Sequence, residues 1–140
     1  MVVETTVIVL KLVVALLLGA LVGLEREWKR KPAGLRTHML VSMGACMFTI
    51  VSMTSFNTDP ARVAAGIVTG IGFIGAGSII GSKGHVHGIT TAATLWIVAA
   101  IGLAVGAEMY VLAFAASILV FIVLQLRRLE VYVEEEANRL

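Results

Sequence analysis

The sequence has few of the residues on which a soluble domain depends. Of its 140 residues, 14% are charged and 6% are aromatic, whereas 59% are hydrophobic. An average soluble domain has about 25% charged residues, and so short a chain has too much surface to bury this many apolar side chains. The composition excludes a soluble domain and predicts a protein that lies mostly in lipid.

Cysteine is almost absent, because Cys46 is the single one in the chain. One cysteine excludes an intrachain disulfide and makes no metal site alone. The sequence also lacks a P-loop, the ligand spacing of a zinc site and a nucleophile beside a base, so we expect no enzymatic activity and no cofactor other than Mg²⁺ as a ligand or substrate. His85 and His87 have no further ligands nearby, which favours solvated loop residues over a metal pair.

Net charge is low as well, at +2 with histidine neutral. The basic residues lie at the ends of apolar segments, where cations face a membrane surface. We therefore expect the lipid bilayer, and not a nucleic acid, to be the partner of these cations.

Long apolar segments make up most of the chain. A helix needs about 20 mostly apolar residues to cross a bilayer, and five candidates lie at about residues 5–24, 38–56, 62–80, 90–105 and 108–126. Backbone in lipid must satisfy its own hydrogen bonds, which favours helices. The sequence predicts an all-α membrane bundle of about five helices over residues 1–128, with a short cytoplasmic tail at 129–140.

The connections between these segments differ in charge. The first, at residues 25–37, holds five cations, the third holds Lys83, and Arg127 and Arg128 follow the last segment. Lys and Arg mark cytoplasmic loops. This predicts an N-terminus outside and a C-terminus inside.

Two helix starts are marked by capping residues. Asp59 can accept a hydrogen bond from the first turn of the third segment, and Pro60 fits that turn because it needs no backbone donor there. Thr90 is predicted to cap the fourth segment.

Glycines recur at small-residue spacing along the apolar segments. Such pairs let helix backbones approach closely in a membrane. Residues 70–75 also match a dinucleotide-binding pattern, but they lack the strand that this fold requires. The alternative to close packing is a third helix broken around residues 70–77, whose backbone lines a polar cavity. The glycines predicted to pack helices are Gly19, Gly23, Gly66, Gly70, Gly72, Gly75, Gly77, Gly102 and Gly106.

Polar residues gather at the edges of the apolar segments, and no carboxylate falls in the middle of one. One interpretation is a polar vestibule that binds an ion or a partner. The other is a set of interfacial charges that end a helix and pair locally. Glu25 and Glu27 are two residues apart and cannot share a helical face, so at most one faces the bundle. The candidate residues are Glu25, Arg26, Glu27, Arg36, Thr37, Asp59, Arg62, Thr90 and Thr91.

Several motifs together carry a resemblance to a known family. They are GALVGLERE at residues 19–27, PAGLRT at 32–37, DPAR at 59–62, GIGFIGAG at 70–77 and GITTAATLW at 88–96. In this order and spacing, which covers most of residues 15–110, they resemble the membrane domain of the MgtC/SapB family.

The resemblance implies a multi-pass helical bundle in the inner membrane of a prokaryote, linked to magnesium homeostasis and adaptation to low magnesium, and in pathogens to survival inside host cells. Members were first described as magnesium transporters. An alternative view is a non-catalytic regulator of membrane partners, with the F-type ATP synthase as a proposed target. We expect the regulator, with an oligomeric transporter or channel for magnesium or another small ion as the alternative. Because so small a bundle has little interior, we also expect a homodimer.

The chain departs from the family pattern in two places. Many members have Arg before a Gly-Leu-Thr-Thr motif, where this chain has His87 and Ile89, so any role of that Arg is in doubt here. Longer members carry an ACT-like domain after the last helix, whereas this chain ends at Leu140. We therefore expect it to lack that domain's function or to depend on another protein for it.

Overall fold

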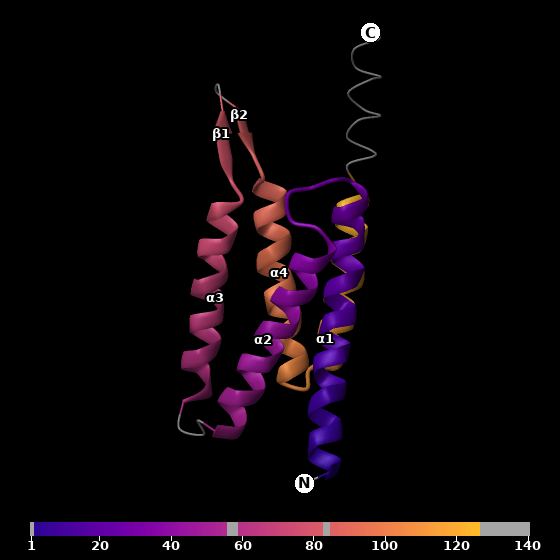
Figure 1. Ribbon diagram of the computed structural model, residues 1–140, viewed down its shortest axis with the longest axis vertical. Coiled ribbons are helices and arrows are strands. Elements are labelled where there is room, and N and C mark those ends of the chain that lie inside the picture. The colour runs from indigo at the N-terminus through magenta and orange to yellow at the C-terminus, as the bar shows by residue number, and fades with distance from the viewer. Residues whose placement is uncertain (1, 56–58, 83–84, 127–140) are drawn as a thin grey trace.

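A computed structural model describes residues 2–55, 59–82 and 85–126 as a bundle of five helices with one small hairpin (Figure 1). The helices are α1 (Val2–Trp28), α2 (Leu35–Ser55), α3 (Pro60–Gly77), α4 (Ile89–Gly106) and α5 (Tyr110–Gln125). The predicted all-α membrane fold with about five helices is confirmed. Four of the helices have the length and apolar composition to cross a membrane, and α5 is a shorter apolar helix. The tail predicted at residues 129–140 lies outside the described residues.

Helix α1 continues past its apolar part to Trp28. Glu and Arg are good helix formers, so the charged residues 25–27 extend the helix instead of ending it. It ends in a Schellman motif, in which the Arg30 amide donates to Glu27 O and the Lys31 amide donates to Arg26 O, both at 2.9 Å. Arg30 takes the left-handed conformation, with φ of 51°, that glycine usually supplies there.

Helix α3 begins as the sequence predicts. The Asp59 carboxylate accepts the Arg62 amide at 3.2 Å, and Pro60 occupies the first turn. The helix runs without interruption to Gly77, so the alternative of a broken third helix is wrong.

The chain between α3 and α4 forms a hairpin, where the sequence predicts a loop. Strands β1 (Ile80–Ser82) and β2 (His85–His87) pair antiparallel. Gly88 then begins α4 with φ of +93°, and a side chain at this position would collide with the Ser78 carbonyl. The predicted Thr90 cap is wrong, because this glycine turn starts the helix before Thr90, which lies exposed in the first turn.

Helix α2 lies between α1 and α4, and glycines make both contacts close. It crosses the bundle obliquely in Figure 1. A Cβ atom at Gly19 on α1 would lie 2.7 Å from His38 O, and one at Gly23 would lie 2.8 Å from the Leu35 Cα. On α4, a Cβ atom at Gly106 would lie 2.7 Å from the Thr49 Cβ, and one at Gly102 would collide with Ser42 O. These four glycines replace side chains with direct backbone contact.

The glycines of α3 differ from those of α1 and α4. Gly75 makes ordinary contact with Ala92, whereas a Cβ atom at Gly66, Gly70, Gly72 or Gly77 would meet nothing within 4 Å in the described part of the chain. The packing predicted for these four residues is therefore not made within this chain, because α3 lies at the edge of the bundle (Figure 1).

An apolar groove of about 570 Å³ separates α2 from α3. Its walls include Gly44 of α2 and both Gly66 and Gly70 of α3, and its whole lining is glycine or apolar. We call it the α2–α3 groove.

Candidate functional site

One end of the bundle collects the polar residues. The C-terminal end of α1, the chain at residues 29–34, the N-terminal ends of α2 and α4 and the C-terminal end of α5 meet there (Figure 1). We call it the basic end, because Lys29, Arg30, Lys31 and Arg36 belong to it together with Arg26.

An ion cluster lies inside the basic end. Glu25 and Arg26 are 4% and 2% exposed, and the Arg26 Nε lies 2.5 Å from Glu25 Oε2. The ammonium of Lys29, the first residue after α1, lies 2.6 Å from Glu25 Oε1. Beyond this ion pair, Glu25 Oε1 accepts no hydrogen bond from the residues that the structure describes. Buried charges are tolerated when they are paired, and here two cations share one carboxylate.

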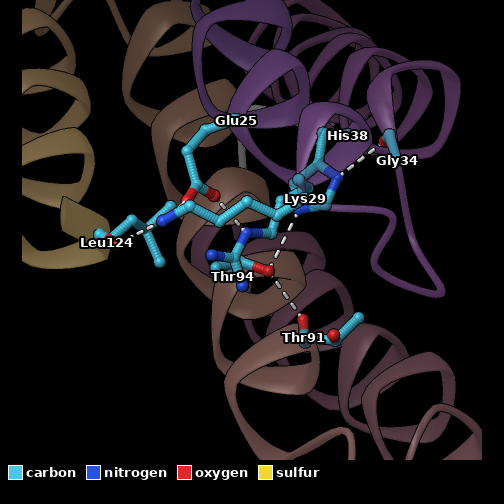
Figure 2. Close-up of polar contacts among 8 residues, drawn as sticks. Glu25, Lys29, Gly34, His38, Thr91, Thr94 and Leu124 are labelled. Atoms are coloured by element: carbon cyan, nitrogen blue, oxygen red, sulfur yellow. Dashed lines mark hydrogen bonds and ion pairs between the residues drawn. The ribbon is translucent and has the colours of Figure 1, made fainter. Parts of the chain in front are cut away.

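Lys29 also joins α1 to α5. Its ammonium donates a hydrogen bond of 3.2 Å to the carbonyl of Leu124 (Figure 2). This carbonyl belongs to the last turn of α5, where carbonyls have no partner within the helix. One side chain thus neutralises Glu25 and caps a helix that lies far away in sequence.

His38 links the start of α2 to α4. The ring is fully buried, with Nδ1 at 2.8 Å from Gly34 O and Nε2 at 3.0 Å from the Thr94 hydroxyl. That hydroxyl lies 2.8 Å from Thr91 O in the preceding turn of α4. Figure 2 shows these hydrogen bonds as one continuous network beside the ion cluster.

Glu27 points out of the bundle but still has a structural partner. Its Oε2 accepts the Leu35 amide at 3.0 Å, at the start of α2. A carboxylate is stabilised at a helix N-terminus by the unpaired amides and the helix dipole. Gly34 makes this approach possible, because a Cβ atom there would collide with the Glu27 carboxylate.

The structure therefore brings together only part of the predicted site. Glu25, Arg26 and Thr91 are buried at the basic end, while Glu27, Arg36 and Thr90 are exposed and Thr37 is half-buried. The expectation that at most one of Glu25 and Glu27 faces the bundle is confirmed, since Glu25 does. Asp59 and Arg62 lie at the opposite end of the bundle, where Arg62 Nε is 3.4 Å from Asp59 Oδ2.

Sequence reasoning missed Lys29, His38 and Thr94 as members of the cluster. A signal for His38 was present in the spacing of polar residues along α2. His38, Ser42, Thr49 and Ser52 recur at three, four and seven residues and are all buried, which is the pattern of one helix face. Lys29 gave no such signal, because it stands among other cations in the sequence.

The cluster holds helices together and buries Glu25 and Arg26, while Lys29 stays partly exposed. Glu25 is taken by Arg26 and Lys29, and the hydroxyl of Thr94 is taken by His38 and Thr91. Within residues 2–55, 59–82 and 85–126, no three His, Cys, Asp or Glu side chains converge as a metal site would require. In this geometry a change in charge at the basic end would disturb the contacts between the helices.

A second ion pair lies at the opposite end. The Lys11 ammonium of α1 is 2.7 Å from Glu108 Oε1, in the turn between α4 and α5. This hydrogen bond and the positive charge hold the pKa of Glu108 below its usual value. Glu108 has φ of 65°, so the turn places a residue other than glycine in the left-handed region.

Comparison with known proteins identifies relatives of the chain. The model of the MgtC family matches residues 12–131. "Putative magnesium transporter YhiD" of Escherichia coli K12 is 41% identical over 130 residues, which are 86% of this chain and 60% of that protein. "Protein MgtC" of Salmonella typhimurium LT2 is 49% identical over 112 residues, which are 80% of this chain and 48% of that protein. The chain thus spans about half to three fifths of these relatives. No solved structure matches it.

Proposed function

The chain belongs to the MgtC family, and we propose that it is an inner-membrane protein of magnesium homeostasis that acts on membrane partners without catalysis. Two relatives carry the names magnesium transporter YhiD and MgtC, which supports a role in adaptation to low magnesium.

One observation carries the choice of a partner-binding role over transport. The buried carboxylate of Glu25 is held between Arg26 and Lys29, so a passing cation would have to displace two fixed positive charges. Magnesium also keeps several waters when it binds and dehydrates reluctantly. A packed cluster of this kind favours a structural or regulatory role for the basic end.

The position of the cations supports an orientation. Five of the seven Lys and Arg residues that the structure describes lie at the basic end, and Lys and Arg favour the cytoplasmic side. With this end in the cytoplasm of a prokaryote, the N-terminus of α1 lies outside and the end of α5 inside.

The α2–α3 groove supports a homodimer. Its glycines offer the close backbone approach that drives helix association in lipid, and its lining has no polar side chain. Helix α3 carries Gly66 and Gly70 itself, so α3 of a second copy is a complementary occupant.

Transport by an oligomer is the second candidate. Ionisable side chains within membrane helices are costly and often mark ion pathways, and Glu25 is such a residue. In this case the Lys29 ammonium would act as a built-in cation that leaves Glu25 Oε1 when an ion arrives.

Magnesium flux into proteoliposomes separates the two candidates. Purified protein is reconstituted with a magnesium-sensitive dye inside, beside the Glu25→Gln variant and protein-free vesicles. We expect no protein-dependent uptake. Uptake that requires the protein and disappears in folded Glu25→Gln would overturn the partner-binding role and establish transport.

A further inference from the structure

The hydrogen bonds around His38 indicate how many protons its ring carries. The Gly34 carbonyl only accepts hydrogen bonds, so His38 Nδ1, at 2.8 Å, must carry a proton. The Thr91 carbonyl also only accepts, so the single hydroxyl proton of Thr94 serves the 2.8 Å contact with it. No proton then remains on Thr94 for the 3.0 Å contact with His38 Nε2.

The three contacts can exist together only when both ring nitrogens carry protons. Nε2 then donates to the Thr94 oxygen, and the ring is a cation. A neutral ring that keeps its bond to Gly34 has a bare Nε2, which must accept the Thr94 hydroxyl proton. In that state Thr94 releases the Thr91 carbonyl. The charge of His38 therefore decides which way a hydroxyl on α4 points.

Charged groups face the ring from one helix. Glu25 and Arg26 of α1 interact electrostatically with His38, and Lys29 is paired with the same Glu25. From α4 the ring meets the hydroxyl of Thr94, and Gly34 contributes its carbonyl. Arg26 and Glu25 carry opposite charges, so their effects on a proton at His38 oppose each other.

We infer that His38 is a proton-binding site whose charge sets the direction of the Thr94 hydroxyl and so the contact between α2 and α4. The neutral ring accepts from Thr94, which then releases the Thr91 carbonyl. The protonated ring donates to Thr94, which keeps its hydrogen bond to Thr91 O, and this is the arrangement in the structure. The inference concerns regulation of the site in the proposed function, and it rests on that function only for its biological consequence.

Direct observation of the ring tests the proton-binding step. The chain has three histidines, so the His85→Gln/His87→Gln variant leaves His38 alone. The variant is labelled with ¹⁵N-histidine in nanodiscs, and its ring signals are followed from about pH 5 to 8, the range in which histidine usually titrates. We expect one step from one protonated nitrogen to two. A ring that keeps one charge state throughout would overturn the inference.

Trp96 reports the coupling step, because it lies on α4 two residues after Thr94 and is 49% exposed. With Trp28→Phe in place, we expect Trp96 fluorescence to change at the pH where His38 titrates. His38→Asn keeps a donor and an acceptor but cannot titrate, so we expect its fluorescence to stay flat. An unchanged titration in folded His38→Asn would overturn the coupling.

Thr94→Val provides a second variant in case His38→Asn does not fold. It replaces the hydroxyl by a methyl group of similar size, so we expect the midpoint of the ring titration to move by about half a pH unit or more. An unmoved midpoint would show that the Thr94 hydroxyl does not respond to the charge of His38. None of these measurements contains magnesium or a partner, so their outcome is independent of the proposed function.

Discussion

Gly102 on α4 lies directly against the backbone carbonyl of Ser42 on α2, with no space for a side chain between them. Ser42 in turn donates its hydroxyl to Ala15 O on α1 at 2.7 Å. Three helices are therefore fixed to one another around a single residue of α2.

We predict that Gly102→Ala destabilises the protein by about 1–3 kcal/mol, as overpacking of a filled core does. The new methyl group would meet rigid backbone, which cannot turn aside as a side chain can. Thermal unfolding in detergent, followed by size exclusion, measures the loss. Gly72→Ala is the matched control, because its methyl group would meet nothing within 4 Å in the described part of the chain. Replacing this helical glycine by alanine should by itself stabilise the helix by about 1 kcal/mol. Equal effects of the two changes would contradict the packing described here.

We predict that Lys29→Met destabilises the bundle by about 1–3 kcal/mol, because Glu25 keeps Arg26 but its Oε1 loses the ion pair with Lys29 in a buried site. It also removes the hydrogen bond to Leu124, so α5 should loosen first. Hydrogen exchange of α5 and thermal unfolding measure both effects.

Arg36→Gln is the control for Lys29→Met, because it removes one exposed cation from the same end of the bundle. Its effect on stability should stay within about 0.5 kcal/mol. If Arg36→Gln were as damaging as Lys29→Met, net charge rather than the Glu25 pair would be the cause.

We predict a pH-dependent contribution from the Lys11–Glu108 pair. The hydrogen bond from Lys11 lowers the pKa of Glu108 below its usual 4.5 in the folded state. A carboxylate with a lowered pKa stabilises the fold fully above its unfolded-state pKa, and this contribution disappears as pH falls through the folded-state pKa. Glu108→Gln should therefore melt at a lower temperature than the parent near neutral pH and at a similar temperature once Glu108 is protonated. A difference that persists in strong acid would exclude the ion pair as its source.

We predict that the α2–α3 groove is the dimer contact. In a Cys46→Ala background, Gly70→Cys should give a cross-linked dimer in membranes, while Val111→Cys, on the exposed face of α5, should give little. Gly70→Leu should shift the protein toward the monomer, because its side chain fills the groove that the second copy would enter. Cross-linking at Val111 in place of Gly70 would move the interface to α5.

Local chemistry accounts for the parts of the fold that were predicted. The apolar segments predicted five membrane helices, Asp59 and Pro60 predicted the start of α3, and the spacing of Glu25 and Glu27 predicted that only one faces inward. The hairpin was missed because its two strands are three residues each, too short for a pattern. The start of α4 was misplaced because Gly88, not a hydroxyl residue, makes the turn.

The site itself was predictable only in part. Glu25 and Arg26 stood out because charges are rare in apolar helices. His38 and Thr94 are 56 residues apart, and Lys29 and Leu124 are 95 apart, and no local pattern states which distant groups will meet.

The sequence by itself determined that the chain lies in a membrane, how many helices it forms and which family it belongs to, because hydropathy, capping and motifs act over short stretches. The tertiary structure alone decided which glycines are contacts and which are left open, and which cation neutralises Glu25. Those outcomes depend on how helices cross and on side-chain directions, which packing fixes across the whole bundle.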